Sequence, residues 1–152
     1  MVLSRGDPAP DIEAPDQHGQ VVKLRDLRGR WVVLFFYPAD DTPGCTAEAC
    51  GFRDDARAWE QAGAVVVGVS TQGVASHQAF ASKHGLDFTL LADTDKRVGK
   101  ALDALNLLGY AKRVTYLIDP QGTIARVWPH VSPRHHSQEV LAALAELRAK
   151  PA

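Results

Sequence analysis

The sequence predicts an α/β domain in which helices flank a central mixed sheet and a small hairpin precedes it. Three observations lead to this fold class: two apolar runs with a helix-like segment between them, a later pair of strand-like runs around a turn, and a final amphipathic segment. With 152 residues, 45% of them apolar, the chain is long enough to bury one core and short for two. We therefore expect a single domain over residues 1–152.

The first two strands are expected at the centre of the sheet. The run from Trp31 to Tyr37 is aromatic and β-branched without alternation, which is typical of a strand covered on both faces, and the run from Ala64 to Val69 has the same character. Between them, Thr46 to Ala62 carries Phe52 and Trp59 at helical spacing. A strand, a helix and a strand in this order predict a right-handed parallel unit.

Further helices are expected after this unit. One runs from about Ala75 to His84 and ends at Gly85, and another runs from about Lys96 to Leu105. A last helix begins with Ser137 as its cap. Its apolar stripe consists of Val140, Leu141, Leu144 and Leu147. This stripe predicts that the last helix packs on the sheet.

An antiparallel hairpin is expected before the last helix. Val114–Ile118 and Thr123–Trp128 flank the four residues Asp119–Gly122, whose second-position proline and fourth-position glycine suit a type I turn. Two short extended pieces around Gly19 predict the small N-terminal hairpin. A parallel pair followed by an antiparallel hairpin, all covered by helices, is the order of a thioredoxin-like domain, which is an analogy at the level of the fold.

Charge and hydropathy exclude several classes of function. Seventeen basic and eighteen acidic side chains leave a net charge of -1, so no broad field steers the protein onto nucleic acid or an anionic membrane. The longest apolar runs fall far short of the roughly 20 residues that a membrane-spanning helix needs. The first residues lack the charged and apolar segments of a secretory signal, so we expect a cytoplasmic protein.

Two cysteines, Cys45 and Cys50, are the first candidates for chemistry. In a reducing compartment, paired thiols are more often catalytic than structural. Thr42 is a suitable helix cap and Pro43 fits the first helical position, so Cys45 falls in the first turn of the helix. Unpaired backbone N–H groups and the helix dipole favour a thiolate at that point. The site also lies beyond the carboxyl end of a parallel strand, where such sheets bind ligands.

Arg113 is the expected cation for this thiolate. If Val114–Ile118 runs antiparallel to Trp31–Tyr37, its beginning lies beside the end of that strand and carries Arg113 toward Cys45. A guanidinium there would stabilise the thiolate and hold an oxygen-bearing substrate. The alternative is an ordinary charge at a strand edge.

Cys50 is too far along an intact helix to form a disulfide with Cys45. Five helical residues place the two Cα atoms roughly 8.7 Å apart on nearly opposite sides, whereas a disulfide needs less than about 7 Å. Pairing would therefore require the first turns to unwind. Gly51 disfavours helix by about 1 kcal/mol relative to Ala, which would ease that opening. Packing in the core is the alternative for Cys50.

Other polar residues have simpler interpretations. His130, His135 and His136 have no third ligand type at metal-binding spacing, so a solvated turn before a helix is favoured over a metal site. Asp40 and Asp41 are interpreted as solvated loop charges, although their closeness to the candidate thiol would oppose its ionisation.

The spacing Pro38-x-x-x-Thr42-x-x-Cys45 closely resembles the signature of the peroxiredoxins in the bacterioferritin comigratory protein or peroxiredoxin Q group. The stretch from Arg113 to Asp119 resembles their second signature, and the similarity extends from about Gly6 to Leu147. Both signatures occur in the expected order, with a second cysteine five residues after the first. The resemblance implies a thioredoxin fold with a thiol peroxidase site.

The resemblance also implies a role for each matching residue. Cys45 would be the peroxidatic cysteine and Cys50 the resolving one. Thr42 and Arg113 would form hydrogen bonds with the thiolate and the peroxide. Pro38 would shield the site, and Glu48 would orient the arginine. Backbone N–H groups of Gly44 and Cys45 would help to stabilise the leaving oxygen. Taken alone, Pro38 could simply end the strand.

The implied reaction starts with attack of the Cys45 thiolate on hydrogen peroxide or an organic hydroperoxide, which gives a sulfenic acid. That group would condense with Cys50 after the helix unwinds, and thioredoxin or a similar dithiol would restore both thiols. No metal or organic cofactor is required by this chemistry. We expect a monomer or a weak homodimer.

Two other classes of function stay open. A non-turnover thiol redox sensor or disulfide exchange module would pass oxidation to a partner protein, although the lack of Cys-x-x-Cys argues against a general exchanger. A sensor would stop after one equivalent of peroxide, whereas a peroxidase would continue. The other class is a binding or chaperone-like domain with inert cysteines, which thiol titration would identify.

Overall fold

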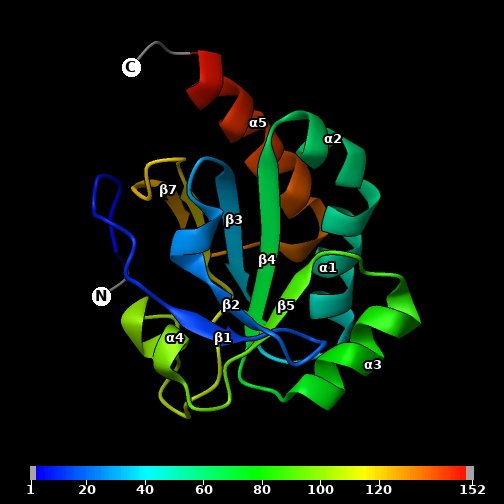
Figure 1. Cartoon of the computed structure of the whole chain (residues 1–152). Helices are drawn as coiled ribbons and strands as arrows, with labels where there is room; N and C mark the ends of the chain where they lie inside the picture. Colours follow the sequence, from blue (N-terminus) through cyan, green and yellow to red (C-terminus); the bar gives the residue numbers. More distant parts are fainter. Residues whose placement is uncertain (1–2, 150–152) are drawn as a thin grey trace.

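A five-stranded mixed sheet in the order β5-β4-β3-β6-β7 forms the centre of the computed structural model, which describes residues 3–149 (Figure 1). The strands are β3 Trp31–Phe36, β4 Ala64–Ser70, β5 Thr89–Ala92, β6 Thr115–Ile118 and β7 Ile124–Trp128. A separate antiparallel hairpin consists of β1 Glu13–Pro15 and β2 Val21–Lys23. The predicted mixed sheet and N-terminal hairpin are therefore confirmed. The ends of the expected 1–152 domain lie outside the described residues.

Helices cover both faces of this sheet. They are α1 Pro43–Asp54, α2 Ala56–Gln61, α3 Val74–His84, α4 Arg97–Ala101 and α5 His136–Ala149, with short 3-10 turns η1 Leu24–Leu27 and η2 Pro133–His135. Side chains of α1, α2, α3 and α5 share one apolar cluster with one face of the sheet. The other face packs against α4, η1 and β1 (Figure 1).

β3 is the central strand and separates the two apolar clusters. Val33 and Phe35 point into the cluster under α1 and α5, whereas Val32, Leu34 and Phe36 point into the opposite cluster. All five side chains are buried. Burial on both faces explains why this strand is apolar without alternation.

The pairing of β3 with its two neighbours sets the position of the site. β4 runs parallel to β3 and β6 runs antiparallel, with Phe35 opposite Thr115. The Phe36 N–H donates to the Val114 carbonyl at 2.8 Å. The beginning of β6 therefore lies beside the end of β3, as the sequence predicted, and Arg113 immediately precedes it.

The helix expected over Thr46–Ala62 is two helices with a break at Asp55. The Asp55 carboxylate accepts a hydrogen bond from Ser137 Oγ at 2.7 Å, and the same Oγ accepts from Trp59 Nε1 at 3.2 Å. Ser137 therefore lies inside α5 and ties it to the α1–α2 junction, so the prediction that Ser137 caps the last helix is wrong.

Two further differences lie between β4 and β6. β5, which pairs in parallel with β4, was not predicted from the sequence. The helix expected over Lys96–Leu105 is only the short α4, because Leu105 folds back over Gly99, where an added Cβ would meet Leu105 Cδ2 at 2.5 Å. By contrast α3 is confirmed, and it ends at Gly85 in the left-handed conformation (φ 63°).

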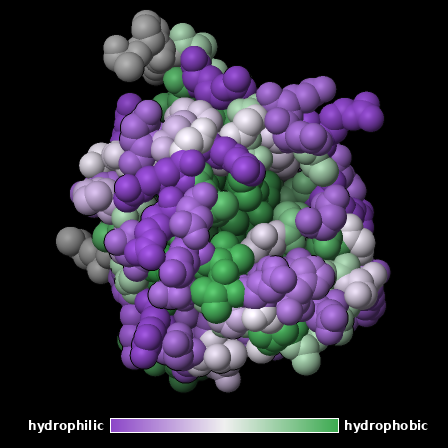
Figure 2. Space-filling view, in the orientation of Figure 1, coloured by the Kyte–Doolittle hydropathy of each residue, from purple (hydrophilic) through white to green (hydrophobic). Residues whose placement is uncertain are grey.

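None of the helices within residues 3–149 combines the length and the apolar character needed to cross a bilayer. In the space-filling view, apolar residues form a narrow strip in front of β4 with hydrophilic residues on both sides (Figure 2). Large apolar side chains are also exposed on the loop that precedes Arg113, at Leu107, Leu108 and Tyr110.

Candidate active site

Cys45 lies in the first turn of α1, directly after the loop that follows β3. Thr42 occupies the N-cap position, Pro43 is the first helical residue, and the Thr46 N–H donates to the Thr42 carbonyl at 2.8 Å. Cys45 is a free thiol and is 1% exposed. The predicted position of Cys45 at the start of a helix is therefore confirmed.

The side chain of Thr42 does not cap the helix, contrary to the prediction. Its hydroxyl donates instead to the Ala39 carbonyl at 3.1 Å, within the loop itself. With its hydrogen committed in this way, the hydroxyl oxygen can still accept a hydrogen bond from a molecule near Cys45.

Arg113 contacts both the thiol and a carboxylate of the same helix. Its Nη2 donates to Cys45 Sγ at 3.5 Å, and its Nη1 donates to Glu48 Oε1 at 3.0 Å. Burial works to lower the pKa of Arg113, but the Cys45 and Glu48 charges and hydrogen bonds outweigh it and raise that pKa. Arg113 is thus a permanent cation beside the sulfur, and the alternative of an unrelated strand-edge charge is wrong.

Glu48 is completely buried one turn after Cys45. Burial raises the pKa of Glu48 to about 7, and the charge and hydrogen bond of Arg113 offset that effect only in part. Within residues 3–149, no side-chain or backbone group donates to its second oxygen, Oε2. The carboxyl group therefore changes its charge near neutral pH while it remains in contact with Arg113.

Gly44 makes room for the guanidinium. A Cβ built on Gly44 would lie 3.1 Å from Arg113 Nη2 and 3.7 Å from Pro133 Cγ in η2. Its backbone N–H lies in the first turn of α1, where helices leave such donors unpaired. Pro38 is half-buried at the start of the loop. The structure thus brings Thr42, Gly44, Cys45, Glu48 and Arg113 together.

Cys50 is half-buried and unpaired on the same continuous helix. An intact α-helix keeps residues five apart beyond disulfide reach, so this structure corresponds to the dithiol form. The next residue, Gly51, has room for a methyl group, because an added Cβ would meet only Ser137 Cβ at 3.8 Å.

Asp40 is not a solvated loop charge, and that prediction is wrong. Its side chain is 4% exposed. The carboxylate accepts hydrogen bonds from Tyr37 Oη at 2.6 Å and Ser76 Oγ at 2.7 Å, and it faces His77 Nδ1 at 2.7 Å. Asp41 is exposed as expected, and Lys83 and His84 of α3 neutralise it.

The group of residues around Asp40 was not predicted from the sequence. One signal was present: His77 shares the buried face of α3 with Phe80 and Ala81, three and four residues later. A histidine at such a position needs a polar partner in the core. The sequence did not indicate which loop would supply it.

His136 is also buried, so the prediction of a solvated turn is wrong for this histidine. Its Nε2 lies 2.7 Å from Thr115 Oγ1 and its Nδ1 lies 2.9 Å from Glu139 Oε1. Burial is the main cause that lowers the pKa of His136. Among the described residues no group of acidic, histidine and cysteine side chains is arranged to hold a metal ion.

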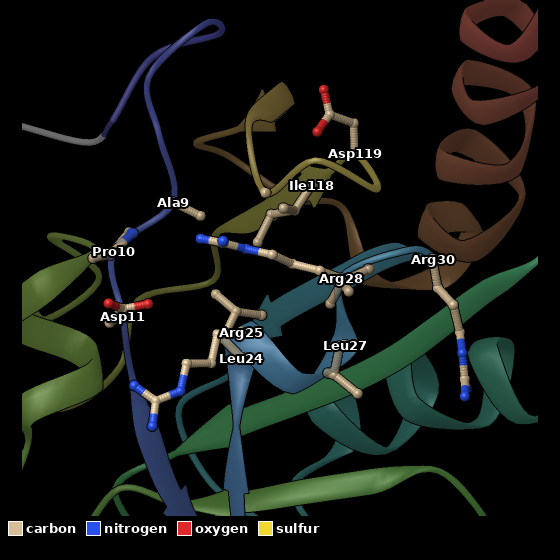
Figure 3. A pocket seen from close by; sticks show the side chains of 12 residues that line it. Ala9, Pro10, Asp11, Leu24, Arg25, Leu27, Arg28, Arg30, Ile118 and Asp119 are labelled. Atoms are coloured by element: carbon tan, nitrogen blue, oxygen red, sulfur yellow. The ribbon is translucent and has the colours of Figure 1, made fainter.

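A hollow at the opposite end of the sheet is too small for a ligand. It is lined by Arg25, Arg28 and Ile118 among others, and its volume of about 10 Å³ leaves room for about one water molecule. Figure 3 shows the Arg28 side chain reaching across it toward Ala9, while Arg30 points away. None of the predicted site residues lines this hollow.

Comparison with known proteins identifies relatives that match almost the whole chain. Residues 5–127 match the family described as AhpC/TSA. Peroxiredoxin Bcp of Bacillus subtilis is 39% identical, and the match covers 99% of this chain and 100% of the Bacillus protein. The chloroplastic peroxiredoxin Q of Triticum aestivum is 40% identical, and the match covers 95% of this chain and 68% of the wheat protein.

A solved structure shares the same fold. The bacterioferritin comigratory protein of Xanthomonas campestris, described in terms of its alkyl peroxide reduction activity, is 34% identical and superposes with a TM-score of 0.85. The match covers 91% of this chain and 92% of that one. The expected thioredoxin-like fold is thereby confirmed.

Proposed function

Because this chain belongs to the AhpC/TSA family, as a peroxiredoxin of the Bcp and peroxiredoxin Q group, we propose that it reduces hydrogen peroxide and organic hydroperoxides through the Cys45 thiolate. The observation that carries this proposal is the Arg113 guanidinium, 3.5 Å from Cys45 Sγ at the N-terminus of α1. A cation and a helix N-terminus together favour the thiolate, which is the nucleophilic form of cysteine.

In the first step the thiolate attacks the terminal oxygen of the hydroperoxide. A sulfur–oxygen bond forms, the oxygen–oxygen bond breaks, and its electron pair leaves on the second oxygen, which takes a proton and departs as water or an alcohol. Cys45 becomes a sulfenic acid. Arg113 and the backbone N–H groups of Gly44 and Cys45 would stabilise the charge on the leaving oxygen, and the Thr42 hydroxyl oxygen would accept from the hydroperoxide O–H.

In the second step the Cys50 thiolate attacks the Cys45 sulfenic sulfur and displaces hydroxide, which leaves as water after it takes a proton. The product is a Cys45–Cys50 disulfide, and α1 must open to allow it. A dithiol protein such as thioredoxin would then reduce the disulfide by thiol exchange and become a disulfide itself. No metal or organic cofactor takes part in this scheme, and the proposed setting is the reducing cytoplasm.

Organic hydroperoxides are included because of the Xanthomonas campestris relative, whose reported activity is alkyl peroxide reduction. The rival function is a redox sensor that reacts with one equivalent of peroxide and passes the oxidation to a partner. Turnover separates the two, because only an enzyme consumes many equivalents when a dithiol recycling system is present.

The test combines turnover with mass analysis of the sulfur. Cys45→Ser is expected to lower thioredoxin-driven peroxide consumption by more than about a thousandfold, because the nucleophile is lost. Cys50→Ser is expected to keep the first oxidation at the wild-type rate but to accumulate sulfinic acid at Cys45. An unchanged rate in Cys45→Ser, or wild-type cycling in Cys50→Ser, contradicts the assignment. Consumption of a single equivalent by the wild type favours the sensor.

A further inference from the structure

The loop between β3 and α1 is held against α3 through Asp40. Tyr37 Oη donates to Asp40 Oδ1 at 2.6 Å, and Ser76 Oγ donates to Asp40 Oδ2 at 2.7 Å. The Asp40 N–H donates to Gln72 Oε1. Asp40 thus fixes the middle of the segment whose ends carry Pro38 and Thr42, next to the reactive sulfur.

His77 completes this network, and each of its two ring nitrogens faces an acceptor oxygen. Its side chain is 0% exposed, with Nε2 2.8 Å from the Leu91 carbonyl oxygen and Nδ1 2.7 Å from Asp40 Oδ2. A carbonyl oxygen can only accept, so Nε2 carries a hydrogen. An ionised carboxylate can also only accept, so Nδ1 carries one as well. Both ring nitrogens are then donors, which is the imidazolium form.

Asp40 is held in its ionised form by its hydrogen-bond donors. Burial works to raise the pKa of Asp40, but hydrogen bonds from His77, Tyr37 and Ser76 outweigh it and lower that pKa. Tyr37 is neutral, because burial first and the Asp40 charge second raise its pKa well above the usual value. The charge of the Cys45 thiolate acts on Tyr37 in the same direction, so Tyr37 lies within electrostatic reach of both anions.

Other charged groups near the pair are already engaged. Asp41, the next residue of the loop, pairs at the surface with Lys83 and His84 of α3. On the other side of Cys45, Arg113 is shared with Glu48. His77 is therefore the cation that faces Asp40 among the described residues. Without it a buried carboxylate near Cys45 would be uncompensated, and a like charge disfavours a thiolate.

We propose that His77 is a positioning residue of the peroxidase reaction, whose buried imidazolium neutralises Asp40 and thereby anchors the Pro38–Thr42 loop without opposing the Cys45 thiolate. This inference rests on the proposed function of Cys45. It explains how an acidic residue can lie two positions after Pro38 and two before Thr42 without suppressing the nucleophile.

The first test is the protonation of His77 in the wild-type protein. Nitrogen-15 NMR of the dithiol form at pH 7 is expected to show both ring nitrogens of His77 protonated. A neutral imidazole, with one unprotonated nitrogen, overturns the proposal. This measurement needs no variant, so it holds even if a substitution prevents folding.

The second test separates charge compensation from a purely structural role. His77→Gln is expected to raise the midpoint of the Cys45 thiolate titration by about half a pH unit to one, and to slow oxidation by hydrogen peroxide below that midpoint about three- to tenfold. The double variant His77→Gln/Asp40→Asn removes both charges and is expected to return the midpoint to the wild-type value. His84→Gln, on the same helix but paired with Asp41, is the matched control and should leave the midpoint unchanged.

Failure of the role proposed for His77 can be distinguished from failure of the proposed peroxidase function. An unchanged midpoint in His77→Gln, or a double variant shifted as far as the single one, overturns the role of His77 while the wild type still consumes peroxide. A wild type that consumes no peroxide overturns the proposed function, and the role of His77 in it, regardless of the NMR result.

Discussion

Arg113 contacts both Cys45 and Glu48, and a negative charge on either one interacts with the same guanidinium. Its two Nη atoms point at Cys45 and Glu48, at 3.5 and 3.0 Å. When Glu48 is neutral, the full charge of Arg113 is available to the thiolate or to a bound peroxide. When Glu48 is ionised, part of that charge is compensated by the carboxylate. The protonation of Glu48 would therefore adjust how much of the Arg113 charge acts on the proposed thiolate of Cys45.

The buried carboxyl of Glu48 makes a stability prediction with a definite sign. Its folded pKa of about 7 lies above the ordinary value of 4.5. Between these pH values the folded chain binds more protons than the unfolded chain, so the free energy of unfolding falls as pH rises. The loss amounts to about 3 kcal/mol by pH 8, at 1.36 kcal/mol for each pKa unit. Glu48→Gln should remove this contribution, because the amide does not ionise.

Urea unfolding of the wild type and of Glu48→Gln at several values between pH 5 and pH 8 measures the difference. The free energy of unfolding of the wild type, minus that of Glu48→Gln at the same pH, should fall as pH rises from 5 to about 7 and then level off. Glu60→Gln, an exposed carboxylate of α2, is the control and should follow the wild type throughout. Parallel curves for Glu48→Gln over the whole range contradict the prediction.

Single residues differ in how far the sequence could predict them. Cys45 and Arg113 were predictable because helix-start residues and strand order alone bring them together. Asp40 was not, since its burial depends on the docking of α3, which is remote in sequence and supplies Ser76 and His77. His136 was missed for the same reason, because its partner Thr115 comes from another element.

At the level of the element, α1 has two halves with different anchors. The first half is held at Arg113 through Cys45 and Glu48. The second half is held by Phe52, stacked on Phe35 at 4.7 Å, and by Arg53, whose Nη1 donates to the His84 carbonyl at 2.7 Å. In the proposed reaction, oxidation of Cys45 would alter the first set of contacts and leave the second intact. We therefore expect opening to stop near Gly51.

Gly51→Ala tests whether helix opening limits disulfide formation. Alanine stabilises a helix interior by about 0.5 to 1 kcal/mol relative to glycine, and the added Cβ meets only Ser137 Cβ at 3.8 Å. The fraction of protein in which the start of α1 is unwound should fall about two- to fivefold. Conversion of the sulfenic acid to the disulfide should slow by the same factor. Stopped-flow fluorescence with mass analysis follows both steps.

The opposite change provides the control for this prediction. Ala47→Gly lies in the first half of α1 and should speed disulfide formation by a similar factor. Neither substitution should alter the first reaction with peroxide, because the proposed scheme places that step in the intact helix. Equal rates of disulfide formation in both variants would mean that opening is not the slow step.

Elements also differ in how clearly the sequence specifies them. β3 was predictable because burial on both faces requires an apolar residue at every position. β5 is only four residues long and takes its identity from parallel pairing with β4, which a short segment does not encode by itself. The break between α1 and α2 depends on Ser137 of α5, so local helical spacing could not reveal it.

At the scale of the whole molecule, the sheet separates the part of α1 that is proposed to open from the apolar cluster on the opposite face. Cys45, Ala49 and Phe52 belong to the cluster on one face of β3, whereas the opposite face packs against α4, η1 and β1. Opening the start of α1 therefore uncovers part of one cluster and leaves the other complete. The proposed redox cycle would then need only a local opening, which costs far less free energy than global unfolding.

Hydrogen exchange of the oxidised protein tests this separation. A Cys45–Cys50 disulfide brings the two Cα atoms closer than helical geometry allows, so the amides of residues 46–50 should lose at least about tenfold in protection. The amides of β3, β4 and β6 should keep the protection of the dithiol form, because their hydrogen bonds lie within the sheet. Cys50→Ser kept under reducing conditions supplies the reference for an intact helix. If mass analysis verifies the disulfide and the amides of residues 46–50 keep their protection, local unwinding is contradicted. If the amides of β3 lose protection, oxidation disrupts the whole sheet.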